Sequence, residues 1–115
     1  MQIQVHFSDI KNSWSLNSHV HQRLTHAIKS GIDQITRIDV HLHDDSGPNK
    51  SGTCDKRCTI EARLAGMQPL SIEQRGNDMY SVINQATRKL QQTLNKARQR
   101  QRENRQHMQY LTMLN

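Results

Sequence analysis

Positively charged side chains gather in the last third of this chain, in numbers that suit the binding of a polyanion. Between Gly76 and Asn115 there are seven Lys and Arg residues but only two acids, so this segment carries +5 of the net charge of +6. The first 75 residues hold nine bases and eight acids and are nearly balanced. A basic segment beside a near-neutral body predicts a polyanionic partner. The seven basic residues are Arg88, Lys89, Lys96, Arg98, Arg100, Arg102 and Arg105.

Residue types that enzymes use for catalysis are present, but their spacing matches no catalytic motif. The sequence contains no Gly-rich phosphate-binding loop, no His-Glu pair of the metalloprotease kind and no nucleophile elbow. Nothing in the spacing of its Ser, His and Asp residues indicates a catalytic triad. We therefore expect a binding protein that is not an enzyme and needs no cofactor.

Two groups of residues could in principle hold a metal ion. Cys54 and Cys58 lie at the start of a stretch in which apolar and polar residues alternate as in a strand. In an extended strand, four residues separate the two sulfurs by roughly 13 Å, which is too far for a disulfide or a shared zinc ion. A turn over residues 55–57 would let them meet, but ordinary reduced thiols are the simpler prediction. His41 and His43 project from one face of a strand, and a metal there would need a third ligand. Exposed histidines are the simpler account, so we predict no metal site.

The length and composition of the chain predict one small domain. A chain of 115 residues supports a single modest core, and with 33% hydrophobic and 3% aromatic residues that core must rest on Ile, Val, Leu and Ala. The first residues do not resemble a signal peptide, and no apolar run approaches the roughly 20 residues of a membrane span. We expect a soluble protein of the cytoplasm.

Periodicity predicts four strands and two helices. Residues 3–7, 38–42 and 58–64 alternate apolar and polar side chains, and Leu70 and Ile72 mark a shorter fourth strand after a turn at residues 66–69. Residues 44–53 have the composition of a loop. The first helix is expected to start at Ser13 as N-cap and to stop at Gly31. Its apolar positions are Leu16, Val20, Leu24, Ala27 and Ile28.

The final helix is expected to begin at Asn77 as N-cap, with an apolar stripe that ends at Ala97. At 100° per residue, Lys89, Lys96 and Arg100 fall on one flank of this stripe, and Arg98, Arg102 and Arg105 on the other. Beyond Ala97 the basic turns should project past the body of the domain. The stripe consists of Met79, Ile83, Ala86, Leu90, Leu94 and Ala97.

Two aromatic residues lie near helix starts, and either could stack on a nucleobase. Trp14 opens the first helix and Tyr80 lies one turn into the second. We favour packing at the edge of the core for both, because aromatic residues at helix starts more often cover a small core.

These elements predict an α+β fold of order β-α-β-β-β-α, like that of double-stranded-RNA-binding domains. Each strand has one apolar face and each helix one apolar stripe, so both helices should cover one face of a four-stranded mixed sheet. The first two strands should pair in parallel and the others as antiparallel hairpins. We assign residues 1–106 to the single domain. For residues 107–115 we favour a mobile tail over an ordered helical extension or a partner-binding segment.

Three sequence patterns resemble those of the bacterial ribosome hibernation family. They are the first-helix pattern Leu16-x-x-x-Val20-x-x-Arg23-Leu24, the D-M-Y-x-x-I start of the second helix at residues 78–83, and R-K-L-x-x-x-L-x-K at residues 88–96. The family comprises the hibernation promoting factors and ribosome-associated inhibitor A, also called sigma-54 modulation proteins, and this chain looks like a short form. The resemblance covers roughly residues 2–100.

The resemblance implies binding to 16S rRNA of the small (30S) ribosomal subunit, in the channel of messenger RNA and of A- and P-site transfer RNA. A protein there keeps idle 70S ribosomes inactive, typically under stress or in stationary phase, and would be a monomer when free. Such binding would use phosphate contacts with a steep salt dependence. The expected RNA-binding residues are Arg23, Lys29, Lys56, Arg57, Arg88, Lys89, Lys96, Arg98, Arg100 and Arg102.

Other partners stay open on the sequence alone. The chain could be a regulator that contacts a protein such as a sigma factor, or a generic binder of double-stranded RNA. A basic helix lying on an anionic membrane fits less well, because the sheet already needs its apolar stripe.

Overall fold

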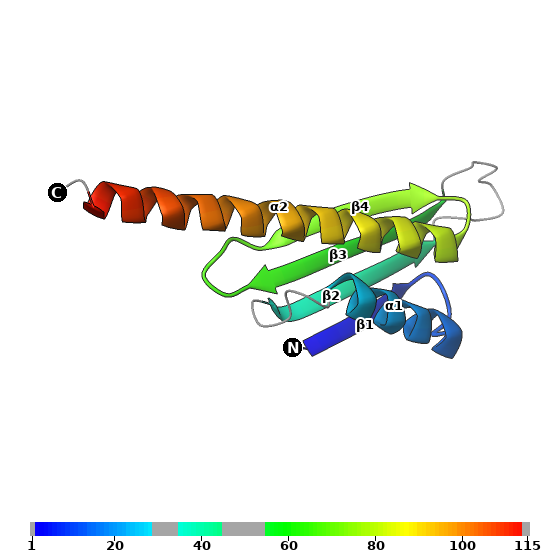
Figure 1. Cartoon of the computed structure of the whole chain (residues 1–115). Coiled ribbons are helices and arrows are strands. Elements are labelled where there is room, and N and C mark those ends of the chain that lie inside the picture. Colours follow the sequence, from blue (N-terminus) through cyan, green and yellow to red (C-terminus); the bar gives the residue numbers. More distant parts are fainter. Residues whose placement is uncertain (1, 29–34, 45–54, 114–115) are drawn as a thin grey trace.

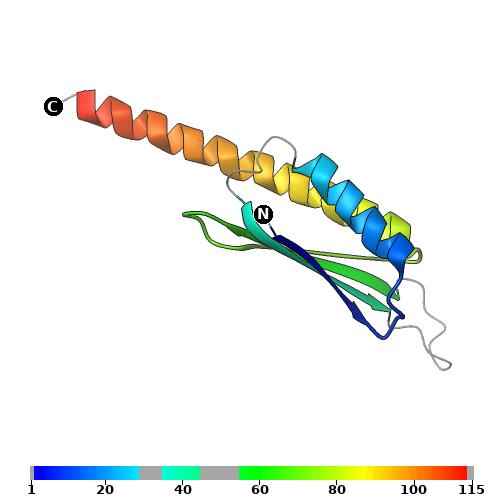
Figure 2. The same ribbon diagram turned by 90° about the horizontal axis from the view of Figure 1, so that it is seen from below.

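The fold, seen in a computed structural model that describes residues 2–28, 35–44 and 55–113, has the predicted element order. The elements are β1 (Gln2–Ser8), α1 (Trp14–Ala27), β2 (Ile35–Asp44), β3 (Lys56–Leu64), β4 (Leu70–Gly76) and α2 (Met79–Met113). Both helices lie on one face of a four-stranded sheet and leave the other face open (Figure 1, Figure 2). The α+β class and the single helical layer are therefore confirmed.

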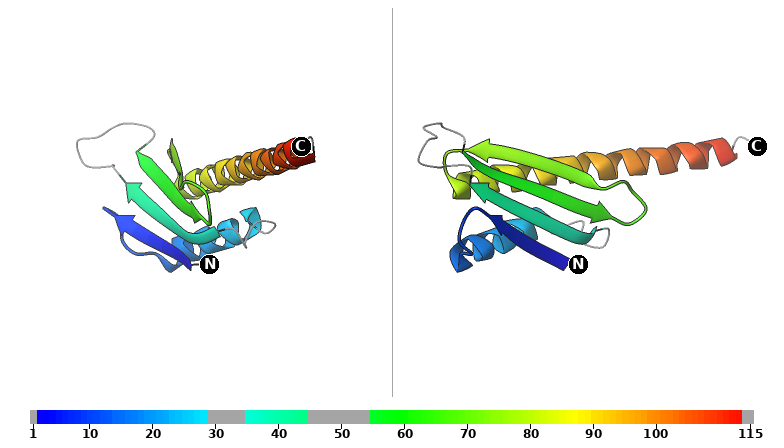
Figure 3. Two further views of the ribbon diagram at one scale, coloured as in Figure 1. Left: turned by 90° about the vertical axis from the view of Figure 1, so that its left-hand side faces the viewer. Right: turned by 180° about the vertical axis from the view of Figure 1, so that it is seen from behind.

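The strands lie side by side in the order β1-β2-β3-β4, as Figure 3 shows from behind. β1 and β2 pair in parallel, with Val5 opposite Val40. The pairs β2–β3 and β3–β4 are antiparallel, with Val40 opposite Ile60 and Ile60 opposite Ile72. One row of apolar side chains thus crosses the whole sheet on its helical face, and the predicted mixed pairing is confirmed.

The core lies between the sheet and the two helices, and its residues are those that the alternation predicted. Ile38, Val40 and Leu42 of β2 are fully buried, as are Cys58, Ile60 and Ala62 of β3. The apolar residues of β1 are only half-buried, because β1 is an edge strand that α1 covers incompletely. β4 is longer than predicted, since its polar end pairs with β3 up to Gly76.

Helix α1 begins as the sequence predicts. The Oγ of Ser13 accepts a hydrogen bond from the N–H of Leu16 at 3.2 Å, which satisfies one of the free donors of the first turn. The helix ends at Ala27, and the N–H of Ile28 donates to the Leu24 carbonyl. The expected stop at Gly31 lies outside the described residues.

The packing role expected of Trp14 is wrong. Its side chain is 82% exposed, because the first position of α1 lies about 120° around the helix from Val20, which faces the sheet. Tyr80 fits the expectation only in part: it is 40% exposed, and its ring packs edge-on against His19 of α1, with the centroids 5.0 Å apart.

Helix α2 begins one residue later than predicted. The N-cap is Asp78 and not Asn77, because Oδ2 of Asp78 accepts the N–H of Ser81 at 3.0 Å and its carbonyl accepts the N–H of Val82. The predicted stripe is buried from Met79 to Leu94. The helix then continues through the boundary we drew at residue 106 and on through residues 107–113, so this part of the tail is helical.

The turn between β3 and β4 is as expected. Gly66 has a φ of +73°, a backbone conformation that glycine adopts freely and that is strained for residues with a side chain. Within the described segments, neither helix combines the length and apolarity that crossing a bilayer requires.

Candidate nucleic-acid interface

Two polar contacts fix which way the flanks of α2 face. Gln85 accepts a hydrogen bond from Gln74 of β4 at 2.8 Å, so this flank faces the β4 edge of the sheet. Asn84 is bonded to His19 of α1 at 2.7 Å, so the opposite flank faces α1. These two contacts orient every later side chain of the helix, because α2 is continuous.

The first group of cations continues the β4 flank. Lys89 lies one turn beyond Gln85, and Lys96 and Arg100 follow on the same side of the helix. All three are exposed. Within the described segments, none of them forms an ion pair with a carboxylate, so their charges are available to a partner.

The second group continues the α1 flank. Arg98 and Arg102 lie four and five turns beyond Asn84, and together with Asn95 and Gln99 they line a shallow hollow of about 380 Å³. Arg98 is half-buried and Arg102 is exposed. Two guanidinium groups one turn apart beside such a hollow are suited to bind a phosphate group between them.

Both groups reach beyond the body of the protein. Among the α2 residues whose burial is described, the last fully buried one is Leu94, and the helix then projects from the sheet and from α1, most clearly in Figure 2. The molecule measures 68 × 25 × 18 Å as a result. From Lys96 to Met113 the projecting part carries five cations and one acid, Glu103, which accepts a hydrogen bond from Gln99. The predicted extension of the basic turns is confirmed.

Of the predicted cations on α1, the structure describes only Arg23. It lies one turn beyond His19 and therefore on the side of α1 that faces α2. Its side chain is half-buried, and the Nε atom is buried with no hydrogen-bond partner in the described part of the chain. Arg88, on α2, is exposed on the side away from the sheet. Lys29 lies outside the described residues.

The two cations predicted at the start of β3 lie apart from the others. Lys56 is 2.9 Å from Asp44 and 3.5 Å from Asp55, and the hydrogen bond to Asp44 raises the pKa of Lys56 above its usual value. Arg57 points to the open face of the sheet, 3.9 Å from Glu73. Both residues lie at the end of the sheet where α2 begins, far from Arg100 and Arg102. The structure thus does not join them to the cations of the helix extension.

The open face of the sheet carries charges of both signs. The Arg37 guanidinium donates to Asp39, and this bond, more than the one from His6, holds the pKa of the Asp39 carboxyl below its usual range. The rings of His6 and His41 stack with centroids 4.6 Å apart, and His43 lies 3.4 Å from Asp9. Among the described residues, no three His, Cys, Asp or Glu side chains converge as metal ligands. Among the described residues, this face mixes cations with the carboxylates of Asp39, Glu61 and Glu73, unlike the projecting part of α2.

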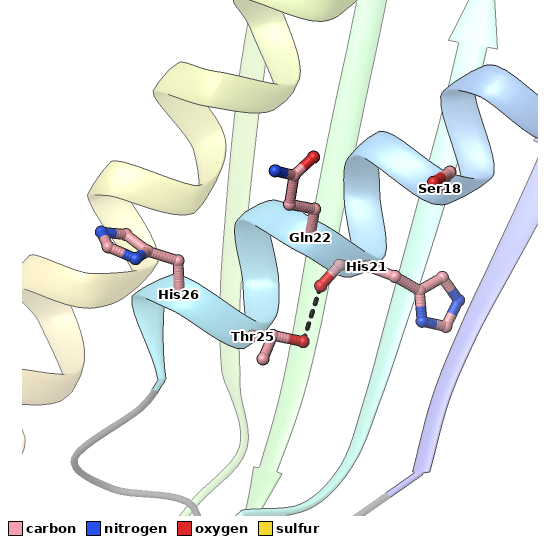
Figure 4. Close-up of a pocket in the computed structure, with 5 residues that line it drawn as sticks. All are labelled: Ser18, His21, Gln22, Thr25 and His26. Atoms are coloured by element: carbon pink, nitrogen blue, oxygen red, sulfur yellow. Dashed lines mark hydrogen bonds between the residues drawn. The ribbon is translucent and has the colours of Figure 1, made fainter.

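A hollow of about 640 Å³ on α1 is lined by no Lys, Arg, Asp or Glu residue. It is lined by Ser18, His21, Gln22, Thr25 and His26, and the Thr25 hydroxyl donates to the carbonyl of His21 (Figure 4). The two histidines point away from one another. The hollow therefore lacks the converging charged groups of an anion or metal site.

The cysteines carry no site in the described structure. Cys58 is a free thiol, and burial raises its pKa to about 12, so at neutral pH it is protonated and a poor nucleophile. Cys54 lies outside the described residues, so the predicted separation of the two sulfurs stays a prediction.

Comparison with known proteins identifies the family. No curated protein matches the chain in sequence. Among solved structures, a ribosomal subunit interface protein from Coxiella burnetii superposes with a TM-score of 0.70 at 23% identity, covering 85% of this chain and 98% of that one. The N-terminal domain of Protein Y from Thermus thermophilus superposes with a TM-score of 0.68 at 18% identity, covering 84% and 98%. The sequence profile of the sigma 54 modulation protein / S30EA ribosomal protein family matches residues 3–102, and the chain belongs to this family.

Proposed function

We propose that this protein binds the small ribosomal subunit, through phosphates of 16S rRNA in the channel of messenger RNA and transfer RNA, and so keeps idle ribosomes inactive. The observation that carries the proposal is the row of exposed cations on the projecting part of α2. Membership of the family and the ribosomal name of the Coxiella burnetii protein support a ribosomal partner. The protein would act in the cytoplasm, under stress or in stationary phase.

The geometry of α2 suits an RNA groove. Cations on two flanks of one continuous helix can contact two phosphate strands at once, and each turn advances the next cation by about 5.4 Å. Structured RNA is recognised largely through its shape, phosphates and 2′-hydroxyls, so no base-specific contact is required of these side chains. We assign the main contacts to Lys89, Lys96, Arg98, Arg100 and Arg102.

The other predicted cations take lesser parts in this proposal. Arg23 would add a contact beside α2, because it lies on the side of α1 that faces α2 and its Nε has no partner among the described residues. Lys56 already has two carboxylate neighbours, so an RNA phosphate would have to compete with Asp44. Arg88 and Arg57 lie on other surfaces and would contact RNA only where it wraps around the domain.

A second candidate, a regulator directed at a protein, is favoured by one observation. At the end of α2, Met108, Tyr110, Leu111 and Met113 are all exposed, at 64%, 59%, 44% and 84%. Exposed apolar residues of this kind can anchor a helix in a protein groove. The two candidates differ in their salt dependence, because phosphate contacts weaken steeply with salt and apolar contacts do not.

The proposal is tested by cosedimentation with purified 30S subunits over a range of salt concentrations. The variant Lys96→Gln/Arg100→Gln should bind more weakly than wild type, with the slope of log K against log salt reduced by about 1.5. The matched control is Arg63→Gln/Arg75→Gln, which removes the same charge from the open face of the sheet. Equal losses in both variants, or no wild-type binding, would contradict the proposal. Competition with a generic RNA duplex at equal affinity would indicate a general binder of double-stranded RNA.

A further inference from the structure

The sole tryptophan of the chain lies on the surface, although the protein has few large aromatic side chains with which to build its core. The chain has one Trp, one Phe and two Tyr residues, and Trp14 is 82% exposed. Burial of an indole ring is normally among the most stabilising contacts that a small core can gain. An exposed Trp is therefore a candidate for contact with a partner.

Trp14 borders a hollow beside the free edge of the sheet. The hollow measures about 350 Å³ and is lined by Val5 and Phe7 of β1 and by Asn12, Ser13, Trp14 and Asn17 of the α1 start. Val5 and Phe7 are only half-buried, because α1 does not cover β1 completely. An apolar floor and an aromatic wall thus face solvent together.

Polar groups complete the hollow. Within the described segments, the side-chain amides of Asn12 and Asn17 form no hydrogen bonds, so both can donate to and accept from a ligand. The Ser13 hydroxyl accepts the N–H of Leu16 and is already in use. Lys11, exposed in the same loop, supplies a positive charge next to the hollow.

We propose that this hollow binds one unstacked nucleobase, which stacks on Trp14 while the amides of Asn12 and Asn17 bond its edge. A flat aromatic ligand with donors and acceptors around its rim fits one aromatic wall flanked by two amides. Lys11 then contacts the phosphate of the same nucleotide. The site rests on the proposed RNA-binding function and adds to it a contact at the end of the domain opposite the α2 extension.

The surroundings of Trp14 favour a nucleobase over a protein partner. A protein hot spot places its Trp in a dry apolar patch, whereas here Asn12, Ser13 and Asn17 share the lining and Lys11 lies beside it. Nucleobases, by contrast, are bound by stacking combined with hydrogen bonds to exposed edges.

Binding at this site can be followed by the intrinsic fluorescence of Trp14, because it is the only tryptophan of the chain. The fluorescence of the full chain is titrated with hexaadenylate RNA and, as a control, with a ribose-phosphate hexamer of the same length that lacks bases. We expect saturable quenching with hexaadenylate only, since an abasic strand offers phosphates but nothing to stack. Equal responses to the two strands, or no response to either, would overturn the site.

A second measurement uses the ribosomal subunit. Trp14→Ala should weaken 30S binding by between about 5- and 150-fold, the range expected for one stacked base, and Trp14→Phe should restore part of it. Both variants should keep the wild-type melting temperature, because the side chain is exposed. Weaker 30S binding of Trp14→Ala without base-dependent quenching would assign Trp14 to a protein contact and overturn the nucleobase site.

The two proposals can fail separately. Loss of binding in the α2 variants together with unchanged binding of Trp14→Ala would leave the proposed function standing and remove the nucleobase site. If the wild type does not bind 30S subunits but hexaadenylate still quenches Trp14, the nucleobase site stands and the ribosomal function falls.

Discussion

The ring of His19 in α1 is hydrogen-bonded through Nε2 to Oδ1 of Asn84 in α2, at 2.7 Å. The amide oxygen is an acceptor, so the imidazole donates. This bond links the two helices above the core and directs one flank of α2, with Arg98 and Arg102 farther along it, toward the side of α1.

Removal of this link should destabilise the domain modestly. We expect Asn84→Ala to lower the free energy of unfolding by about 1 kcal/mol, because a partly buried imidazole N–H loses its partner. Urea unfolding at pH 8 measures the change. Asn95→Ala, at an exposed position of the same helix, is the control and should have almost no effect. If the two variants unfold alike, the contact contributes nothing to stability.

A second prediction concerns the close approach of Gly76 to α2. A Cβ atom at Gly76 would lie 2.8 Å from Cγ2 of Val82, which is 1% exposed and confined by the core. Gly76→Ala should therefore destabilise the protein by about 1–3 kcal/mol, the usual cost of overpacking. In a Val82→Ala background the same substitution should cost much less, because the opposing methyl group is gone.

Gly66→Ala is the matched control for this cycle. Nothing lies within 4 Å of the added methyl group, so its cost comes from the φ of +73° alone. That cost should be the same in the wild-type chain and in the Val82→Ala background. Equal costs of Gly76→Ala in both backgrounds, measured by urea unfolding, would show that the approach to Val82 is not the cause.

Periodicity predicted the fold because every strand and helix buries one face only. Alternation placed Ile38, Val40 and Leu42 in the core, and the 100° repeat placed Lys96 and Arg98 on opposite flanks of the last helix, which is what the structure shows. Residues that repeat with the geometry of an element are predictable without knowledge of their neighbours.

Features that depend on contacts across the fold were not predictable. Asn77 and Asp78 are both good N-caps, and only the direction of the chain leaving β4 decides between them. The pairing of Lys56 with Asp44 follows from the register of β2 and β3. The exposure of Trp14, by contrast, could have been predicted, because the 100° repeat places it about 120° around α1 from Val20.

A third prediction concerns the reactivity of Cys58. Burial raises its pKa from 9.0 to about 12, so the native thiol should react with Ellman's reagent at pH 8 far more slowly than an unfolded one. The measurement uses a Cys54→Ser variant, so that Cys58 is the only thiol, with and without urea. Rapid reaction under native conditions would show that Cys58 is accessible.

The same pKa shift has a consequence for stability at high pH. Above about pH 9 the unfolded chain loses the Cys58 proton while the native protein keeps it up to about pH 12. The unfolded state then binds fewer protons, so stability falls as pH rises through this window. Cys58→Ala should reduce the fall relative to the parent chain.

The last prediction separates the cations of α2 from the apolar residues at its end. A chain ending after Ala97 loses Arg98, Arg100, Arg102 and Arg105 together with Glu103, but no residue that the structure describes as buried. Its melting temperature by circular dichroism should stay within about 3 °C of wild type, since few contacts are lost. Its affinity for 30S subunits should fall by at least about tenfold at moderate salt.

A chain ending after His107 keeps all the cations and removes the exposed residues Met108–Met113. Full binding by this second chain would place the interaction on the charges, whereas its loss would favour a protein groove that holds the apolar end of the helix.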